Sequence, residues 1–204
     1  MAPWWSTSLK TAPATEPVSL AEAKLHCRVD TDVTDEDTLL TNQIVAAREY
    51  AESCTNRAFI TQTWYLKLDD RFPCGGAIVL PRPPLASVTA VSYVDPAGVT
   101  QAWAAGATGY QLVAPAGPKA QYARIVPSYG IPYPVTRCQP EAVTVEYVCG
   151  YGAASAVPDA IKAAMLLLIG HWFTHREVVV VGTITSTLQL TVEALLAPYA
   201  VDRW

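Results

Sequence analysis

The spacing of apolar residues changes twice along this 204-residue chain, and this change constrains the fold more than any other feature. Between Thr34 and Asn56 the apolar residues recur at steps of four and three, the period of a helix with one buried face. From Ile60 to Gly150 they alternate, as in a strand. Helical spacing returns after Pro158. This order predicts an α+β fold, a small helical bundle of about four helices with an antiparallel β insertion between the second and third helices.

The first two helices have recognisable start and stop signals. Ser19 and Glu22 form a capping box, which predicts a short helix to about His26. Thr34 with Asp37 marks the start of the next helix, and Asn56 marks its end. The predicted buried stripe of this second helix consists of Leu40, Ile44, Ala47, Ala51 and Cys54, and the predicted off-stripe residues are Arg48, Glu49 and Glu52.

The β insertion and the C-terminal helices follow from similar signals. Alternation from Trp64 to Leu68 and from Val143 to Cys149 predicts two of several short strands, and Asp95–Gly98 has the composition of a turn. The helix after Pro158 is apolar nearly all round, so it is expected to be buried against its own domain or a neighbouring subunit. Thr191 is predicted to cap a last short helix, 192–197, which Pro198 stops.

These patterns predict four segments. They are an extended N-terminal arm at 1–17, the first part of a helical domain at 18–58, the β insertion at 59–152, and the second part of the helical domain with a C-terminal tail at 153–204.

Composition limits the possible partners. With 14 basic and 18 acidic residues, the formal net charge is −4, and no basic cluster is present that would grip phosphates. Five cysteines without Cys-x-x-Cys spacing favour free thiols in a reduced compartment. The apolar runs are too short to span a bilayer and no signal peptide is apparent. We expect a soluble protein made in a bacterial cytoplasm, with no membrane partner.

Few residues suggest chemistry. His171 and His175 have a spacing that suits a shared metal, but Trp172 stands where a zinc protease needs Glu, and His26 is the only other histidine. No family signature surrounds any cysteine, and no phosphate-binding or nucleophile-elbow motif occurs. The acidic run 30–37 lacks the glycine and closing glutamate of a calcium loop. We therefore predict no catalytic residue, no metal site and no cofactor.

Several segments, in their order and spacing, resemble one family. They are Glu16–Lys24, Arg28–Asp30, Ala46–Tyr50, Thr61–Trp64, Leu80–Leu85, His171–Glu177 and Glu193–Tyr199. From about residue 16 to the C-terminus, the chain resembles the phage head–tail connector (adaptor) family. Cys27 stands where an apolar residue is expected, and Trp4 and Trp5 lie outside the match. The two tryptophans either fold back on their own domain or anchor in a partner.

The resemblance implies a structural role without catalysis. Connector subunits form a ring of twelve under the portal protein after DNA packaging, extend the DNA channel and provide a docking platform for the stopper or tail-terminator protein. DNA would pass through without specific binding. The resemblance places the protein in the virion, at the head–tail interface of a phage or gene transfer agent. The alternatives are a tail-side structural protein (stopper or tail terminator) and, more distantly, a phage-particle cysteine hydrolase.

Two candidate contact surfaces follow. A ring needs one face of a subunit to meet a different face of the next subunit. The candidate residues for this subunit–subunit contact are Trp172, Val178, Val179, Val180 and Val181. The candidate residues for portal binding are Tyr199, Arg203 and Trp204. Deletion of 199–204 is predicted to abolish portal docking and to leave the fold intact.

Overall fold

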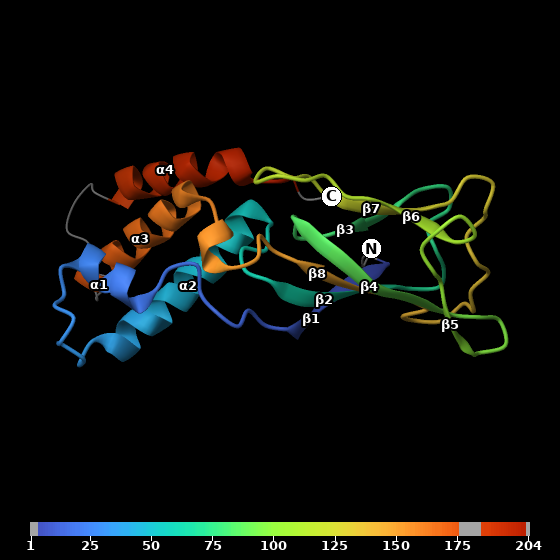
Figure 1. Ribbon diagram of the computed structural model, residues 1–204, viewed down its shortest axis with the longest axis horizontal. Helices are drawn as coiled ribbons and strands as arrows, with labels where there is room; N and C mark the ends of the chain where they lie inside the picture. Colours follow the sequence, from blue (N-terminus) through green and yellow to red (C-terminus); the bar gives the residue numbers. More distant parts are fainter. Residues whose placement is uncertain (1–3, 176–184, 203–204) are drawn as a thin grey trace. The chain divides into compact units, whose positions relative to one another are not determined.

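A computed structural model describes residues 4–175 and 185–202, and side chains within 4–175 and 190–202. The chain forms two compact units, shown in Figure 1. Residues 1–13 and 61–150 form the β unit, and residues 14–60 and 151–204 form the helical unit. Strands β2 to β8 all lie between the second and third helices in the chain, so the predicted α+β architecture is confirmed.

The described residues of the helical unit form four α-helices and two short 3-10 helices. They are α1 (Leu20–Cys27), α2 (Asp37–Thr55), η1 (Ala154–Ala156), α3 (Asp159–Thr174), α4 (Thr185–Leu196) and η2 (Ala197–Tyr199).

The predicted caps of α1 and α2 are partly confirmed. The Ser19 hydroxyl accepts the Glu22 amide at 3.2 Å, and the Glu22 carboxylate accepts the Ser19 amide at 2.7 Å. Asn56 ends α2 in the left-handed conformation, with φ 54°. The predicted start of α2 is wrong. Thr34 accepts the Asp37 amide through its carbonyl at 3.1 Å and so lies in a turn before the helix, and Glu36 takes the N-cap position.

The last helix is longer than predicted. The structure begins α4 at Thr185, so Thr191 lies inside the helix and does not cap it. Pro198 falls within η2, where a proline in the first turn loses no helical hydrogen bond. The helical path therefore continues past Leu196 for one tight turn that includes Pro198, which the sequence pattern did not indicate.

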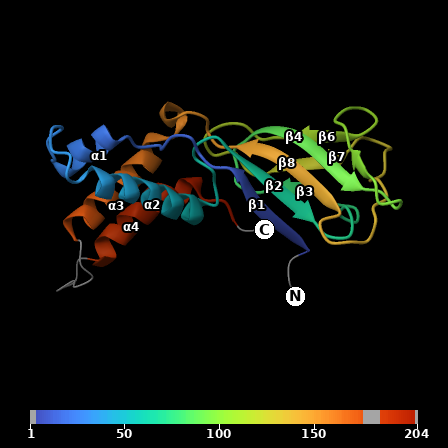
Figure 2. The same ribbon diagram turned by 90° about the horizontal axis from the view of Figure 1, so that it is seen from below.

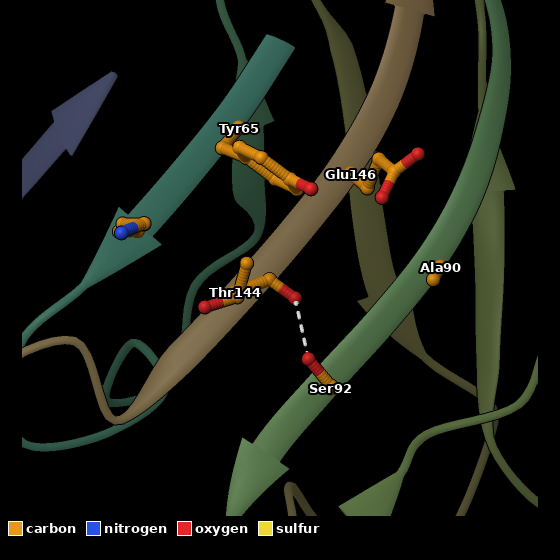
Figure 3. Close-up of a pocket in the computed structure, with 6 residues that line it drawn as sticks. Tyr65, Ala90, Ser92, Thr144 and Glu146 are labelled. Carbon is orange, nitrogen blue, oxygen red and sulfur yellow. Dashed lines mark hydrogen bonds between the residues drawn. The ribbon is translucent and has the colours of Figure 1, made fainter. Parts of the chain in front are cut away.

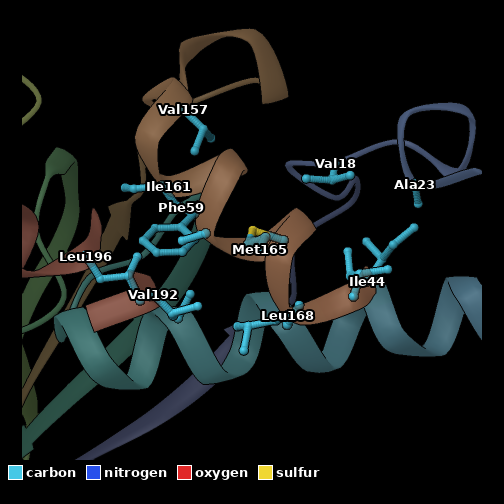
Figure 4. Packing of buried hydrophobic residues seen from close by; sticks show 14 of the residues in the cluster. Val18, Ala23, Ile44, Phe59, Val157, Ile161, Met165, Leu168, Val192 and Leu196 are labelled. Atoms are coloured by element: carbon cyan, nitrogen blue, oxygen red, sulfur yellow. The ribbon is translucent and has the colours of Figure 1, made fainter. Parts of the chain in front are cut away.

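The core of the helical unit lies between α2 and α3, and Figure 4 shows Met165 in its middle. Leu40, Ile44, Ala47 and Ala51 of α2 are buried as predicted. Cys54 is exposed, however, whereas Arg48 and Glu52 are buried at 7% and 4% exposure, so their predicted positions are wrong. The buried face of α2 is displaced toward these two residues because they carry ion pairs inside the unit.

These ion pairs form a network around Arg48. Its guanidinium binds Glu16 at 2.8 Å and Glu52 at 3.0 Å, and the second Glu52 oxygen accepts the Phe59 amide at 2.7 Å. Buried charges are tolerated only when they are paired and hydrogen-bonded in this way. The network therefore fixes both the incoming segment at Glu16 and the segment that leaves α2.

The β unit contains two antiparallel sheets, which lie in two layers (Figures 1 and 2). The five-stranded sheet has the order β1 (Trp5–Thr11), β2 (Gln62–Leu68), β8 (Val143–Cys149), β4 (Leu85–Val94) and β5 (Thr100–Ala102). The three-stranded sheet has the order β3 (Ile78–Leu80), β7 (Ala123–Pro127) and β6 (Tyr110–Val113).

Residues 5–11 lie within the predicted extended N-terminal arm, and the structure places them in a sheet, which the sequence did not indicate. They form β1, which pairs antiparallel with β2 from Trp5 opposite Leu68 to Thr11 opposite Thr63. The segment has no apolar periodicity because an edge strand with two exposed faces needs none. Its partner lies more than fifty positions further along the chain, so no local signal revealed the pairing.

The alternation predicted for β2 and β8 places apolar residues in the core of the β unit. Leu66, Leu68, Val143 and Val145 are at most 2% exposed. An aromatic cluster extends this core, in which the Phe72 ring lies 4.9 Å from Tyr133 and 5.1 Å from Trp103, centroid to centroid. Burial in this cluster raises the pKa of Tyr133 to about 12.

Candidate functional site

The C-terminal segment is attached to the end of α2. The Val201 amide donates to the Thr55 carbonyl at 3.1 Å, and the Asn56 side chain donates to the Val201 carbonyl at 2.8 Å. The Val201 side chain is 3% exposed. The carbonyl of Tyr199 accepts a hydrogen bond from the Arg57 guanidinium. The path of the chain is thus fixed as far as residue 202.

Arg57 is the central residue of this attachment, and sequence reasoning missed it. Its side chain is among the largest that are fully buried in the described part of the chain. It also interacts with Tyr151, whose pKa is raised because burial outweighs the opposing effect of the guanidinium. The only signal in the sequence was a cation directly after the helix stop at Asn56.

Of the three candidate portal residues, the structure describes only Tyr199. The Tyr199 backbone is held by Arg57 and its side chain is half-buried, whereas Arg203 and Trp204 lie outside the described residues. The contacts of 199–201 argue against the expectation that 199–204 can be deleted with the fold intact, which stays a prediction. That deletion would remove Val201 from the core and leave the buried Arg57 without its carbonyl acceptor.

The candidate subunit contact is also only partly described. Trp172 lies on α3, half-buried and packed against the core of its own unit. Val178, Val179, Val180 and Val181 lie outside the described residues. Most of the apolar surface of α3 faces its own unit, where Ile161, Ala164, Met165 and Ile169 are fully buried. The described part of α3 is therefore buried mainly against its own domain, one of the two partners that the sequence left open.

The two histidines of α3 contact one another. Their ring centroids are 4.6 Å apart, and the His175 Nδ1 lies 3.1 Å from the His171 carbonyl oxygen. Within residues 4–175 and 190–202, no group of three or more His, Cys, Asp or Glu side chains is placed to hold a metal ion.

Three of the five cysteines lack the surroundings of an activated thiol. Burial raises the pKa of Cys27, and the hydrogen bond to Asp70 raises the pKa of Cys138. A reactive thiol needs the opposite shift, because the thiolate is the nucleophile. Cys149 is buried and donates to the Gln62 carbonyl at 3.8 Å.

An open groove of about 390 Å³ runs across the outer face of the five-stranded sheet. Figure 3 shows Tyr65, Thr144, Ser92 and Glu146 on this face, from three neighbouring strands. Across the sheet, Lys10 pairs with Glu146 at 2.8 Å. The groove is polar and its charges are paired, so it offers a hydrated surface without an evident reaction centre.

No helix in the described ranges is both long and apolar enough to cross a membrane.

Comparison with known proteins gives one family. Residues 17–91 match the family model described as Phage gp6-like head-tail connector protein. No curated protein matches the sequence significantly.

The solved structures extend this similarity along the chain. A chain in the virion of a native gene transfer agent particle is 26% identical, with 97% of this chain and 96% of that chain covered and a TM-score of 0.74. A chain in the neck of an empty gene transfer agent particle, computed with C6 symmetry, is 27% identical, with 98% and 97% covered and a TM-score of 0.75. A chain in the neck of a native particle, computed with C12 symmetry, is 24% identical, with 97% of both chains covered and a TM-score of 0.66, and shows the fold alone.

The resemblance to the phage head–tail connector family is thereby confirmed, in sequence over residues 17–91, while chains of gene transfer agent particles share the fold over nearly the whole length.

Proposed function

We propose that this protein is a structural head–tail connector subunit of a phage or gene transfer agent particle. The observation that carries the proposal is the similarity of almost the entire chain to a component of a gene transfer agent neck, together with the connector-family match at 17–91. Both units of the protein are included in that similarity. The proposal therefore concerns the whole chain and not one shared module.

In the proposed role, about twelve copies form a ring under the portal protein and present a platform to the stopper or tail-terminator protein. The sixfold symmetry used for the neck of the similar particle is compatible with a ring of twelve. The net charge of −4 supports a channel that DNA passes without strong binding, because phosphate affinity depends on Lys and Arg. The proposed site of action is the virion, after synthesis in the host cytoplasm.

The proposed role is structural and not enzymatic. The raised thiol pKa values of Cys27 and Cys138 support this proposal, because they disfavour the hydrolase alternative. Replacing these cysteines by serine is expected to leave particle assembly unchanged.

The proposal is tested by mixing the purified protein with the portal of the same particle and imaging the complex by negative stain. A ring of added density on the narrow end of the portal is expected, and its subunits can be counted. Binding to tail tubes in place of the portal would assign the protein to the tail side and overturn the connector proposal.

The portal contact is proposed to lie at the C-terminus. Because residues 199–202 are anchored on α2, the appropriate variant removes only 203–204. This deletion is expected to weaken portal binding at least tenfold without changing the unfolding midpoint. The matched control is Asp202→Asn, which alters an exposed residue beside the deletion and is expected to bind normally. Undiminished portal binding after removal of 203–204 would refute the C-terminal contact.

A further inference from the structure

The five-stranded sheet has two edges at which further strands could pair. On one side β1 is the last strand of the sheet. On the other side β5 pairs only with residues 92–94 of β4. Within the described residues, the first part of β4, 85–90, therefore has a strand only on its β8 side. Figure 2 shows β1 and β4 on opposite sides of β2 and β8.

Both open edges are exposed and nearly free of charge. Ser6, Ser8 and Leu9 of β1 are exposed, as are Ala86, Ser87, Thr89 and Ala90 of β4. No charged residue occurs in β4. The single charge of β1, Lys10, is paired with Glu146 and lies over the Tyr65 ring, 5.2 Å from its centroid.

This composition is unusual for the edges of a sheet in a monomer. Natural edge strands commonly carry exposed lysines or prolines, which prevent pairing with other chains. β4 has neither residue, whereas β1 has one exposed lysine, Lys10, whose charge is paired with Glu146. Two bulges in β4, at 85–87 and 88–90, bend and twist the strand, and such bending is what a curved, closing sheet requires.

The strand directions make the two edges complementary. Each strand in the order β1-β2-β8-β4 is antiparallel to its neighbour, so β1 and β4 run in opposite directions. If a second copy follows the first with the same orientation, its β1 is antiparallel to the β4 that it meets. Antiparallel pairing is the more stable kind per residue. The contact joins two different surfaces, as a closed ring requires.

We propose that the five-stranded sheet continues from subunit to subunit, with β1 of one copy pairing antiparallel with residues 85–90 of β4 in the next. This inference rests on the proposed function and specifies how the ring is joined. With strands about 4.8 Å apart, four strands per copy span about 19 Å. Twelve copies would give a sheet about 230 Å around and about 70 Å across, which leaves room for a DNA duplex and the side chains facing it.

The backbone directions identify which amides take part. The Asp69 amide donates to the Trp4 carbonyl at 2.9 Å, so residues 4, 6 and 8 face β2 and the Thr7 amide faces the open edge. The Trp103 amide donates to the Val91 carbonyl at 2.8 Å, which places Val91 on the outer side of β4. The register shift between Val88 and Ala90 interrupts this alternation at Thr89, so the β4 edge is tested through the exposed Thr89 side chain and not through an amide.

Proline at Thr7 tests the β1 edge directly, because it removes an outward amide and leaves the inward hydrogen bonds in place. Thr89→Lys tests the β4 edge, because a lysine at this exposed position places an unpaired charge where a second strand would pair. Each variant alone is expected to be monomeric, and each is expected to lose ring assembly on the portal at least tenfold. A mixture of both variants retains one intact pair of edges and is expected to form dimers but no rings, measured by mass photometry.

Thr7→Ala and Thr89→Ala are the matched controls, because they remove the same side chains without removing an amide or adding a charge. Both are expected to assemble as the unmodified protein does. Normal rings from either blocking variant, or no dimer in the mixture of two folded variants, would overturn the edge pairing. If the unmodified protein forms no ring on the portal, the proposed function itself fails, so the two failures can be distinguished.

Hydrogen exchange on the unmodified protein provides a second measurement, which does not depend on the folding of any variant. Peptides covering 5–11 and 85–91 are expected to exchange at least tenfold more slowly in the assembled ring than in the free subunit. A ring that leaves exchange in both peptides unchanged would also overturn the proposal.

Discussion

The helical unit and the β unit differ in where they place their polar groups. The helical unit carries seven basic and thirteen acidic residues, a net charge of −6, whereas the β unit carries seven basic and five acidic residues, a net charge of +2. In the helical unit, Arg48, Glu52 and Arg57 are buried and bonded internally. In the β unit, the charged pairs lie on the outer sheet face and open strand edges remain.

This difference suggests a division of roles. A unit whose buried charges are internally paired loses stability when one partner is removed, because the remaining charge has no water to solvate it. A unit with open edges has backbone groups available for a partner chain. We therefore expect substitutions in the helical interior to act on folding and substitutions at the β edges to act on assembly. The stability of four variants tests the expectation for the helical unit and compares it with close contacts inside the β unit.

The largest effect is expected for Arg57→Ala. The side chain is fully buried and donates to the Tyr199 carbonyl, so its loss leaves a cavity and an unsatisfied acceptor. The free energy of unfolding should fall by about 4 kcal/mol. Urea unfolding measures this change. Arg124→Ala, at an exposed position of β7, is the control and should change it by less than about 0.5 kcal/mol. A loss below about 1 kcal/mol for Arg57→Ala would contradict the attachment of the C-terminal segment.

Gly109→Ala should have the largest effect in the β unit. A Cβ at this position would lie 1.8 Å from the Ala104 carbonyl oxygen, which is a backbone atom and cannot rotate away. We expect a loss of about 3 kcal/mol by urea unfolding. The control is Gly76→Ala, where the nearest atom would be 3.7 Å away. Equal stability of the two variants would show that this turn is more adaptable than its close contact implies.

Ser128→Ala should have a smaller effect in the same unit. The hydroxyl donates to the Gly106 carbonyl at 2.6 Å, and the residue is 4% exposed. Loss of this buried hydrogen bond should cost about 1 kcal/mol by chemical denaturation. Ser155→Ala, at an exposed position in the helical unit, is the matched control and should be neutral. A larger loss of stability for Ser155→Ala than for Ser128→Ala would show that burial of the hydroxyl does not determine the effect.

The smallest effect concerns the α1 cap and depends on pH. Hydrogen bonds from Ser19 lower the pKa of Glu22 below its ordinary value of 4.5. A lowered pKa means that the cap stabilises the folded state above about pH 4.5 and loses this contribution as the pH falls through the folded-state pKa. Ser19→Ala should cost about 1 kcal/mol at neutral pH.

The difference between Ser19→Ala and the unmodified protein should narrow in acid, as measured by urea unfolding at several pH values. Ser155→Ala serves again as the control, with no change expected across the same range. A difference that widens as the pH falls would contradict the assigned role of the Glu22 carboxylate.

Local signals in the sequence predicted the elements whose stabilising contacts are local. The Ser19–Glu22 cap and the Asn56 stop depend on neighbours within four positions, and both were predictable. The burial of Arg48 and Glu52 was not, because it depends on Glu16 and Phe59, which a helical stripe does not include. β1 was missed for the same reason, since its pairing with β2 is long-range.

The candidate site was less predictable than the fold. The importance of a C-terminal segment was inferred from Tyr199, Arg203 and Trp204, yet the residue that anchors this segment is Arg57, at the end of α2. The open edges of the sheet could not be recognised before the strand order was known, because an edge is a property of topology and not of composition.

Particles made without this protein provide a direct test of whether it joins heads to tails. We expect DNA-packaged heads and separate tails in its absence, and joined particles once the purified protein is added. Thr7→Pro protein should fail in this addition, whereas Thr7→Ala protein should succeed. Complete, tailed particles formed in the absence of the protein would rule out the head–tail connector role.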